Sequence, residues 1–254
     1  MSSLGGILEL ERAAFEAWQA EEIVALGPWR LRFMRGVTNR ANSVWAGPGE
    51  PDGGFARAID AAEAFYAARN LAPTFQITPS ADARLDALLA ERGYSSFDEV
   101  SMQTADASRV ANGEARLGAT AHCEDALSEP WFDLSGRRGR FRSEDVAVYR
   151  AFLERIAQRA GFAIASSAPN AEPGAVGLTI LAPPLAGIFS MLTLPSHRRR
   201  GLAAAILREL ARFAQTRGSR RLYLQVEVAN TPAQALYTHA GFSEAYRYHY
   251  RRRT

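Results

Sequence analysis

The residues best suited to chemistry form a short basic turn, Arg198-Arg199-Arg200-Gly201, between an apolar, strand-like run and an amphipathic helix. Gly201 lets the backbone approach a ligand closely, because glycine has no Cβ. The first N–H groups of the following helix lack intrahelical partners, and the helix dipole adds partial positive charge at the same end. With three guanidinium groups beside it, this turn predicts a binding site for an anion such as a pyrophosphate.

A second polar segment begins with a strand pattern over residues 221–228. Apolar and polar side chains alternate along it, so the two sets face opposite sides of a sheet. Thr231 and Pro232 are typical of an N-cap and a first helical residue, and Gly241 stands where a helix end requires a left-handed residue. The segment therefore predicts a strand, a short helix carrying Tyr237, and a sharp stop before Phe242.

Both segments resemble signatures of the GCN5-related N-acetyltransferase (GNAT) superfamily. The first signature, Arg/Gln-x-x-Gly-x-Gly/Ala, is matched by Arg198, Gly201 and Ala203. The second, N-x-x-A-x-x-L-Y-x-x-x-G-F, is similar to Asn230 followed by Ala235-Leu236-Tyr237 and Gly241-Phe242, with the alanine one place later than usual. The resemblance covers roughly residues 119–254 and implies an α/β (α+β) fold with a mixed, mostly antiparallel sheet of the GNAT type.

The resemblance also implies the chemistry: an amine attacks the thioester of acetyl-CoA, the co-substrate, directly and without a metal. The backbone of Met191, Leu192 and Thr193 would pair with the pantetheine arm like an added strand. Asn230 would hydrogen-bond this arm. Tyr237 would protonate the departing thiolate, because a phenol pKa of about 10 exceeds that of a thiol. Backbone N–H groups and arginines would hold the pyrophosphate, and the residues concerned are Arg198, Arg199, Arg200, Gly201, Leu202, Ala203 and Ala204.

The general base departs from the family pattern. Some members carry Glu at the strand position of Gln225, twelve residues before Tyr237, and an amide cannot accept the proton. Glu227 lies two residues further along on the same face and is the candidate base. Three alternatives stay open: Glu227 as an ordinary charged strand residue, a water chain as base, and an acceptor that arrives neutral.

Three functions remain under consideration. The favoured one is an N-acetyltransferase acting on a primary amine of a small molecule or peptide. The second is a non-catalytic acyl-CoA-binding sensor or regulatory module, which would need Gly201 and the arginines but not Tyr237. The third is a binder of another phosphorylated ligand or of nucleic acid through arginines clustered at 137–142, 198–200, 217–221 and 251–253. No nucleic-acid-binding motif accompanies these clusters, and the paired signatures argue against this third function.

The N-terminal half shows a weak internal repeat. Gln76 lies 17 residues before Gly93, and Gln225 lies 16 residues before Gly241, with a strand and a helix in each interval. The copy lacks the chemistry, because its loop has Gly53-Gly54 without an arginine cluster. We therefore predict a degenerate GNAT-like domain over 1–108 and an acetyl-CoA-binding GNAT domain over 119–254, joined by a linker or crossover at 105–120.

Periodicity and turn signals predict the remaining elements. Trp131 and Phe132 are expected to begin a loop, and Trp45, Asn42 and Trp131 are candidates to line the acceptor site, with nothing to favour them. The expected helices are 6–26, 55–69 and 81–92, and the expected strands are 29–33, 43–46, 74–78, 97–104, 161–166 and 174–181.

Composition bounds the class of protein. The chain has 254 residues, 47% of them hydrophobic and 22% charged, with a net charge of +3. It contains no lysine, so all 30 Lys-or-Arg positions are arginine. No membrane span or signal peptide is expected. One cysteine, Cys123, cannot form an internal disulfide, and the expected location is the cytoplasm. The oligomeric state stays open.

Overall fold

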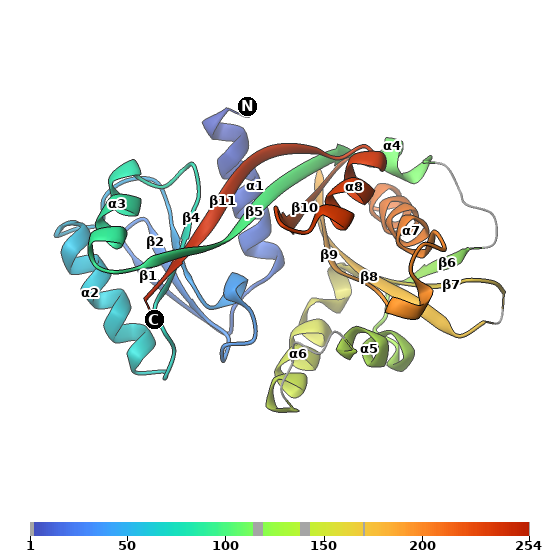
Figure 1. Ribbon diagram of the computed structural model, residues 1–254, viewed down its shortest axis with the longest axis horizontal. Helices are drawn as coiled ribbons and strands as arrows, with labels where there is room; N and C mark the ends of the chain where they lie inside the picture. Colours follow the sequence, from blue (N-terminus) through green and yellow to red (C-terminus); the bar gives the residue numbers. More distant parts are fainter. Residues whose placement is uncertain (1–2, 114–118, 138–142, 170, 254) are drawn as a thin grey trace. The chain divides into compact units, whose positions relative to one another are not determined.

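The computed structural model describes residues 3–113, 119–137, 143–169 and 171–253 (Figure 1). The chain divides into two compact units. Unit 1 comprises Met1–Met102, Glu227–Ala229 and Ala245–Thr254, and unit 2 comprises Gln103–Val226 and Asn230–Glu244. The predicted division into 1–108 and 119–254 differs from these units, because the last strand of the chain pairs within unit 1 and residues 103–108 belong to unit 2.

Unit 1 is a mixed sheet with strand order β1-β2-β3-β4-β11-β5. The pairs β1–β2, β2–β3 and β4–β11 are antiparallel, whereas β3–β4 is parallel. Its elements are α1 (Leu4–Ala17), β1 (Glu22–Leu26), β2 (Trp29–Phe33), the 3₁₀ turn η1 (Asn39–Ala41), β3 (Val44–Ala46), α2 (Gly54–Ala67), β4 (Thr74–Ile77), α3 (Ala83–Glu91), the first part of β5 (Ser95–Asp106) and most of β11 (Ser243–Arg252).

One face of this sheet forms the core of unit 1. Trp29, Phe75 and Leu85 are completely buried there, together with Ile59 and Leu89. Helices α2 and α3 supply the facing side chains, as the apolar spacing over 55–69 and 81–92 predicted. Both helices are confirmed, and so are the strands expected at 29–33, 43–46, 74–78 and 97–104, within one or two residues at most ends.

The helix predicted over residues 6–26 is wrong in its second half. Helix α1 ends at Ala17, and Glu22–Leu26 forms strand β1. The β-branched Ile23 and Val24 favour an extended backbone. Leu26 pairs with Trp29 across the two-residue turn Gly27-Pro28, whose first residue has φ +56°, as a tight hairpin requires. Pairing with β2 therefore overrides the helical periodicity.

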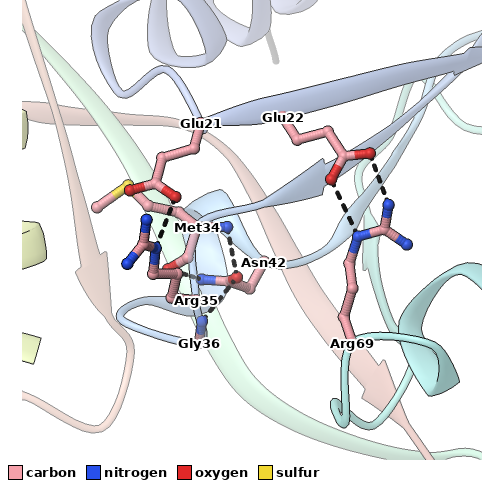
Figure 2. A network of polar contacts seen from close by, with 7 residues as sticks. All are labelled: Glu21, Glu22, Met34, Arg35, Gly36, Asn42 and Arg69. Carbon is pink, nitrogen blue, oxygen red and sulfur yellow. Dashed lines mark hydrogen bonds and ion pairs between the residues drawn. The ribbon is translucent and has the colours of Figure 1, made fainter. Parts of the chain in front are cut away.

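A polar network closes the turn between β2 and β3 (Figure 2). The Asn42 side chain is buried, and its Oδ1 accepts hydrogen bonds from the backbone N–H of Met34 at 2.8 Å and of Gly36 at 3.0 Å. Its Nδ2 donates to the carbonyl of Thr38 at 2.7 Å. Asn42 thus holds the backbone of this turn. Two ion pairs lie beside it, Glu21–Arg35 and Glu22–Arg69.

The C-terminal strand β11 is held in unit 1 by backbone pairing and by one carboxylate. Arg251 pairs with Phe75 in the antiparallel register of β11 with β4. Asp86 of α3 accepts hydrogen bonds from Arg251 Nε at 2.7 Å and Nη2 at 3.0 Å, and its Oδ1 lies 2.8 Å from His249 Nε2. The hydrogen bond from Arg251 is the main reason that the pKa of Asp86 falls to about 2.

Substituting Asp86→Asn is expected to lower the free energy of unfolding by about 1 kcal/mol at pH 7, a modest value because the pair is partly exposed. A carboxyl with a depressed pKa stabilises the fold above its unfolded pKa of about 3.9, and this stabilisation is lost as the pH falls toward 2. Urea unfolding at pH 7 and pH 2.5 measures the difference. Asp60→Asn, at a more exposed pair with Arg92, is the control. An Asp86→Asn deficit of equal size at both pH values would contradict the prediction.

Unit 2 has strand order β5-β10-β9-β8-β7-β6, with β10–β9 parallel and the pairs from β9 to β6 antiparallel. Helix α7 covers one face of this sheet, and α5 and α6 cover the other (Figure 1). Its elements, after the end of β5, are α4 (Ala107–Ala111), β6 (Thr120–Glu124), α5 (Glu129–Gly136), α6 (Ser143–Ile156), η2 (Ala157–Arg159), β7 (Ala160–Ser166), β8 (Pro173–Ala182), β9 (Leu185–Thr193), η3 (Pro195–His197), α7 (Leu202–Thr216), β10 (Arg221–Glu227) and α8 (Thr231–His239).

Two expectations for unit 2 are wrong. The segment 105–120, expected to be a polar linker or crossover, contains α4, which is N-capped by Asp106, and its Val110 is buried in the core against α7. Residues 114–118 lie outside the described residues. Trp131 and Phe132 belong to α5, which begins at Glu129 with Pro130 in its first turn, and both side chains are buried. Of the arginine cluster at 137–142, residues 138–142 also lie outside the described residues.

Helix α7 approaches strand β8 closely at Gly177. A Cβ at this position would lie 2.5 Å from Ile206 Cγ2 and 2.7 Å from Met191 Sδ. Because Gly177 has no side chain, helix α7, which follows the basic turn, can pack directly against the sheet.

Substituting Gly177→Val is expected to lower the free energy of unfolding by about 1–3 kcal/mol, because the added atoms overpack this contact. Urea unfolding measures the change. The control is Gly5→Ala in α1, where no atom lies within 4 Å of the added Cβ and a small gain in stability is expected. Unchanged stability in Gly177→Val would mean that the contact is not tight.

Candidate active site

The basic turn leads into α7 through a glycine in the left-handed conformation. Gly201 is the N-cap of α7 with φ 82° and ψ 1°, in the left-handed region, and Arg199 also has a positive φ of 64°. Arg198, Arg199 and Arg200 are exposed. Leu202 starts the helix and is buried beneath the turn. The result is a helix N-terminus preceded by three exposed arginines, which favours an anionic ligand electrostatically.

Strands β9 and β10 pair over only part of their length. Their parallel ladder runs from Leu185 with Arg221 to Ile188 with Leu224 in the described residues. Strand β9 continues to Thr193, paired on its other side with β8, where Ala175 faces Thr193. The part of β9 beyond the ladder with β10 carries the predicted pantetheine-binding residues Met191, Leu192 and Thr193. An extended ligand bound to this segment would take the place of a neighbouring strand.

A β-bulge lies at the point where the β9–β10 ladder ends. The register of β8 with β9 shifts between Val176, which faces Leu192, and Leu178, which faces Phe189. Ser190 occupies the bulge with φ 48°, an uncommon conformation for a residue other than glycine. Its Oγ lies 3.0 Å from the Tyr149 Oη of α6. No motif in the sequence marks this pair, although a serine within an apolar strand run is an available signal.

Helix α8 begins one residue earlier than the sequence predicted. Asn230, and not Thr231, is the N-cap, and its side-chain oxygen accepts a hydrogen bond from the N–H of Ala233 at 3.3 Å. Asparagine is among the preferred N-cap residues, so it takes this position ahead of threonine. The predicted contact of Asn230 with the cofactor arm would come from its amide nitrogen or from the second lone pair of its oxygen.

Tyr237 is rigidly placed in unit 2. Its side chain is only 7% exposed, and its ring packs edge-on against Phe242 with 5.9 Å between the ring centres. Gly241 has φ 100°, and the N–H of Phe242 donates to the Tyr237 carbonyl at 2.9 Å, which closes the helix in a Schellman motif. The predicted left-handed glycine is thus confirmed. Gln103 of β5 also holds the helix, donating from Nε2 to Gln234 Oε1 at 2.6 Å.

Gln225 and Glu227, the two strand residues considered in connection with the general base, belong to different units. Gln225 lies within unit 2, on the face of β10 that also carries Tyr223. Glu227 ends β10 with an exposed side chain and belongs to unit 1, whereas Tyr237 belongs to unit 2. The role of Glu227 as base stays a prediction.

The three candidates for the acceptor site, Trp131, Trp45 and Asn42, make hydrogen bonds within the protein. Trp131 is completely buried, and its indole N–H donates to the Gly177 carbonyl at 3.0 Å. The indole N–H of Trp45 donates to Glu11 Oε2 at 2.9 Å. Asn42, as described above, bonds its own turn. Their hydrogen-bonding groups are therefore already engaged with the protein itself.

Other chemistries find little support in the described residues. Burial raises the pKa of the Cys123 thiol to about 12, which suppresses the thiolate a nucleophile requires. Among the residues described, no cluster of three His, Cys, Asp or Glu side chains could hold a metal ion. No helix in the described ranges is long and apolar enough to cross a membrane.

The N-terminal unit repeats two backbone features of the candidate site without the three arginines and the tyrosine. Gly53 caps α2 with φ 82° and ψ 6°, almost the same conformation as Gly201. Helix α3 ends like α8: Gly93 has φ 83°, and the N–H of Tyr94 donates to the carbonyl of Leu89 at 2.9 Å. Leu89 is therefore the counterpart of Tyr237.

Comparisons with known proteins agree with this geometry. Residues 5–251 match the family described as "Probable histone acetyltransferase Rv0428c C-terminal". The uncharacterized N-acetyltransferase YobR of Bacillus subtilis is 30% identical over 248 residues, 96% of this chain and 98% of that protein.

Two solved structures share the fold. A GCN5-related N-acetyltransferase from Kribbella flavida has a TM-score of 0.70 at 17% identity, covering 97% of this chain and 95% of the other. A tandem GNAT protein from the clavulanic acid biosynthesis pathway has a TM-score of 0.62 at 17% identity, covering 81% and 71%. With the family match over nearly the whole length, the chain belongs to the Rv0428c C-terminal family of the GNAT superfamily.

Proposed function

We propose that this protein is an acetyl-CoA-dependent N-acetyltransferase that acts on a primary amine of a small molecule or peptide. The observation that carries the proposal is one continuous segment. Strand β9 extends beyond the residues that pair with β10. The chain then continues through the basic turn into the N-terminus of α7 at Gly201. A ligand with an extended arm and a pyrophosphate matches this order of a strand edge followed by an anion site.

Acetyl-CoA would bind along this segment. The backbone of Met191, Leu192 and Thr193 would pair with the pantetheine arm. The first N–H groups of α7 and the neighbouring arginines would hold the pyrophosphate. Backbone N–H groups at the bulge would stabilise the developing oxyanion, because they are held in place before the reaction starts.

The transfer step then follows from this placement. The amine nitrogen attacks the thioester carbonyl, a C–N bond forms, and the C–S bond breaks. The departing thiolate takes the proton of the Tyr237 phenol. The amine loses one proton to water or to the predicted base Glu227, and solvent returns a proton to the phenolate. No metal takes part.

A second candidate is a non-catalytic acyl-CoA-binding sensor. Gln225 favours it, because a glutamine stands where a carboxylate base is found in some relatives. This alternative requires the same cofactor contacts but no turnover.

Unit 1 is proposed to be a degenerate GNAT copy that does not bind acetyl-CoA. Leu89 replaces the tyrosine, and the turn before Gly53 carries no arginine. A Cβ at Gly54 would lie 3.3 Å from Glu50 Oε1, so a carboxylate stands near the N-terminus of α2. This carboxylate is ion-paired with Arg84 at 3.0 Å, so the turn presents a charge pair where the turn before α7 presents three successive arginines.

Calorimetric titration with acetyl-CoA and with CoA tests the proposed function. A dissociation constant in the micromolar range and one site per chain are expected. Amines are then screened by release of the CoA thiol, using a peptide with N-terminal alanine, a lysine peptide and spermidine. Because the chain contains no lysine, its own side chains offer no amine acceptor. Absence of binding would refute the proposal, and binding without turnover would support the sensor.

A further inference from the structure

Ser190 combines three unusual features. It has a positive φ of 48° in the interior of a strand, and it marks the register shift of a β-bulge. It is also the polar member of an otherwise apolar run, Leu185 to Leu194, apart from Thr193. Strained, polar positions of this kind gather at functional sites, because the surrounding structure must hold them in place.

The bulge directs Ser190 toward the α5–α6 face of the sheet. Ile188, just before it, is buried on the opposite face among the apolar residues of α7, and Met191, just after it, packs against the same cluster. Phe189 packs against Tyr223 on the α5–α6 face, and Ser190 contacts Tyr149 of α6. Since α7 and its core fill the other face, an acceptor must approach the end of the ladder from the α5–α6 face.

Tyr149 is itself held firmly. Its side chain is 3% exposed, and its ring stacks on Phe132 with 6.3 Å between the ring centres and 26° between the planes. The Arg150 guanidinium lies over the Phe132 ring, 3.8 Å from its centre. It also donates two hydrogen bonds of 2.8 Å to the carboxylate of Glu129. The hydroxyl of Tyr149 is therefore presented to Ser190 from a fixed position, while Ser190 remains partly exposed.

We propose that Ser190 Oγ accepts a hydrogen bond from the attacking amine of the acceptor, and that Tyr149 is the positioning residue that orients Ser190. This inference rests on the proposed function, which places the thioester along β9 beside Met191. A hydroxyl oxygen suits the N–H of a neutral amine and would direct the nitrogen lone pair toward the thioester carbonyl. The Ser190 hydroxyl would thus orient the amine, although Gln225 cannot act as a base for it.

The experiment compares Ser190→Gly, Ser190→Ala and Tyr149→Phe with the wild type, using whichever of the three screened amines the wild type acetylates fastest. KM for the amine is expected to rise about tenfold in all three variants, the equivalent of one hydrogen bond. The dissociation constant of acetyl-CoA is expected to stay within about twofold. Ser190→Asn, which keeps an acceptor oxygen and tolerates a positive φ, is expected to recover part of the loss.

Ser190→Gly separates the hydroxyl from the strained backbone. Glycine relieves the strain of the positive φ. The melting temperature of the Ser190→Gly variant is therefore expected to equal or exceed that of the wild type, while its KM for the amine still rises. The matched control is Ser135→Ala, which removes a buried hydroxyl that bonds the Phe132 carbonyl at 2.8 Å in the same unit. Wild-type kinetics are expected for this control.

Two results would overturn the inference alone: an unchanged KM for the amine, or a parallel weakening of acetyl-CoA binding that places Ser190 in the cofactor site. If the wild type binds acetyl-CoA but acetylates none of the three amines, the proposed role of Ser190 in binding the acceptor amine would also be refuted. Failure of acetyl-CoA to bind the wild type would instead refute the proposed function itself.

Discussion

Replacing Tyr237 with phenylalanine is expected to lower kcat for acetyl transfer by about 10²–10³-fold, within the range that loss of a general acid produces. The dissociation constant of acetyl-CoA is expected to stay within about twofold of the wild type. The thiolate would then have to leave without a proton from the phenol. Release of the CoA thiol measures kcat, and calorimetry measures binding.

The fold should tolerate this substitution, so the effect can be assigned to the hydroxyl. The ring of Tyr237 packs edge-on against Phe242, and phenylalanine preserves that contact. The backbone bond from Phe242 to the Tyr237 carbonyl involves no side-chain atom. A phenylalanine variant therefore keeps the packing and the helix end.

Tyr94→Phe is the matched control for this variant. Tyr94 follows Gly93 at the end of α3, and its hydroxyl donates to Glu63 Oε1 at 2.8 Å within unit 1. Its loss should reduce stability slightly and leave kcat unchanged. If Tyr237→Phe turned over at the wild-type rate, Tyr237 would be a core residue and another group would protonate the thiolate.

The substitution Gly201→Glu is expected to weaken acetyl-CoA binding at least 100-fold, about 2.7 kcal/mol. Two physical effects act together. A side chain at φ 82° strains the turn and obstructs the close approach of a ligand, and the carboxylate repels the pyrophosphate at the helix N-terminus. Calorimetric titration of both proteins measures the loss.

Gly53→Glu offers a control with the same chemistry in unit 1. Gly53 caps α2 at φ 82° and ψ 6°, so a glutamate there brings nearly the same backbone strain and the same charge. Acetyl-CoA binding is expected to stay within about twofold, because unit 1 is proposed not to bind acetyl-CoA and the six residues before Gly53 include no arginine. Equal losses in both variants would indicate general destabilisation, and tight binding by Gly201→Glu would rule out the predicted cofactor turn.

Features of this protein that depend on neighbouring residues can be predicted from its amino-acid sequence. The left-handed Gly241, helix α7 and the position of Tyr237 on a short capped helix all follow from periodicity and cap chemistry within a few residues. The repeat of strand, helix and glycine was visible for the same reason. These local signals were sufficient to indicate the GNAT superfamily.

Features that depend on residues far apart in the chain are established only in the folded protein. Glu22–Leu26 is a strand because β2 is available to pair with it, although its periodicity continues that of α1. The last strand of the chain completes the sheet of unit 1 through β4 and Asp86, far away in the sequence. Ser190 and Tyr149 are 41 residues apart and meet only because the bulge turns the serine toward α6. Helix caps and turns are governed by bonds within about four residues, whereas sheet pairing and side-chain contacts form only once the chain has folded.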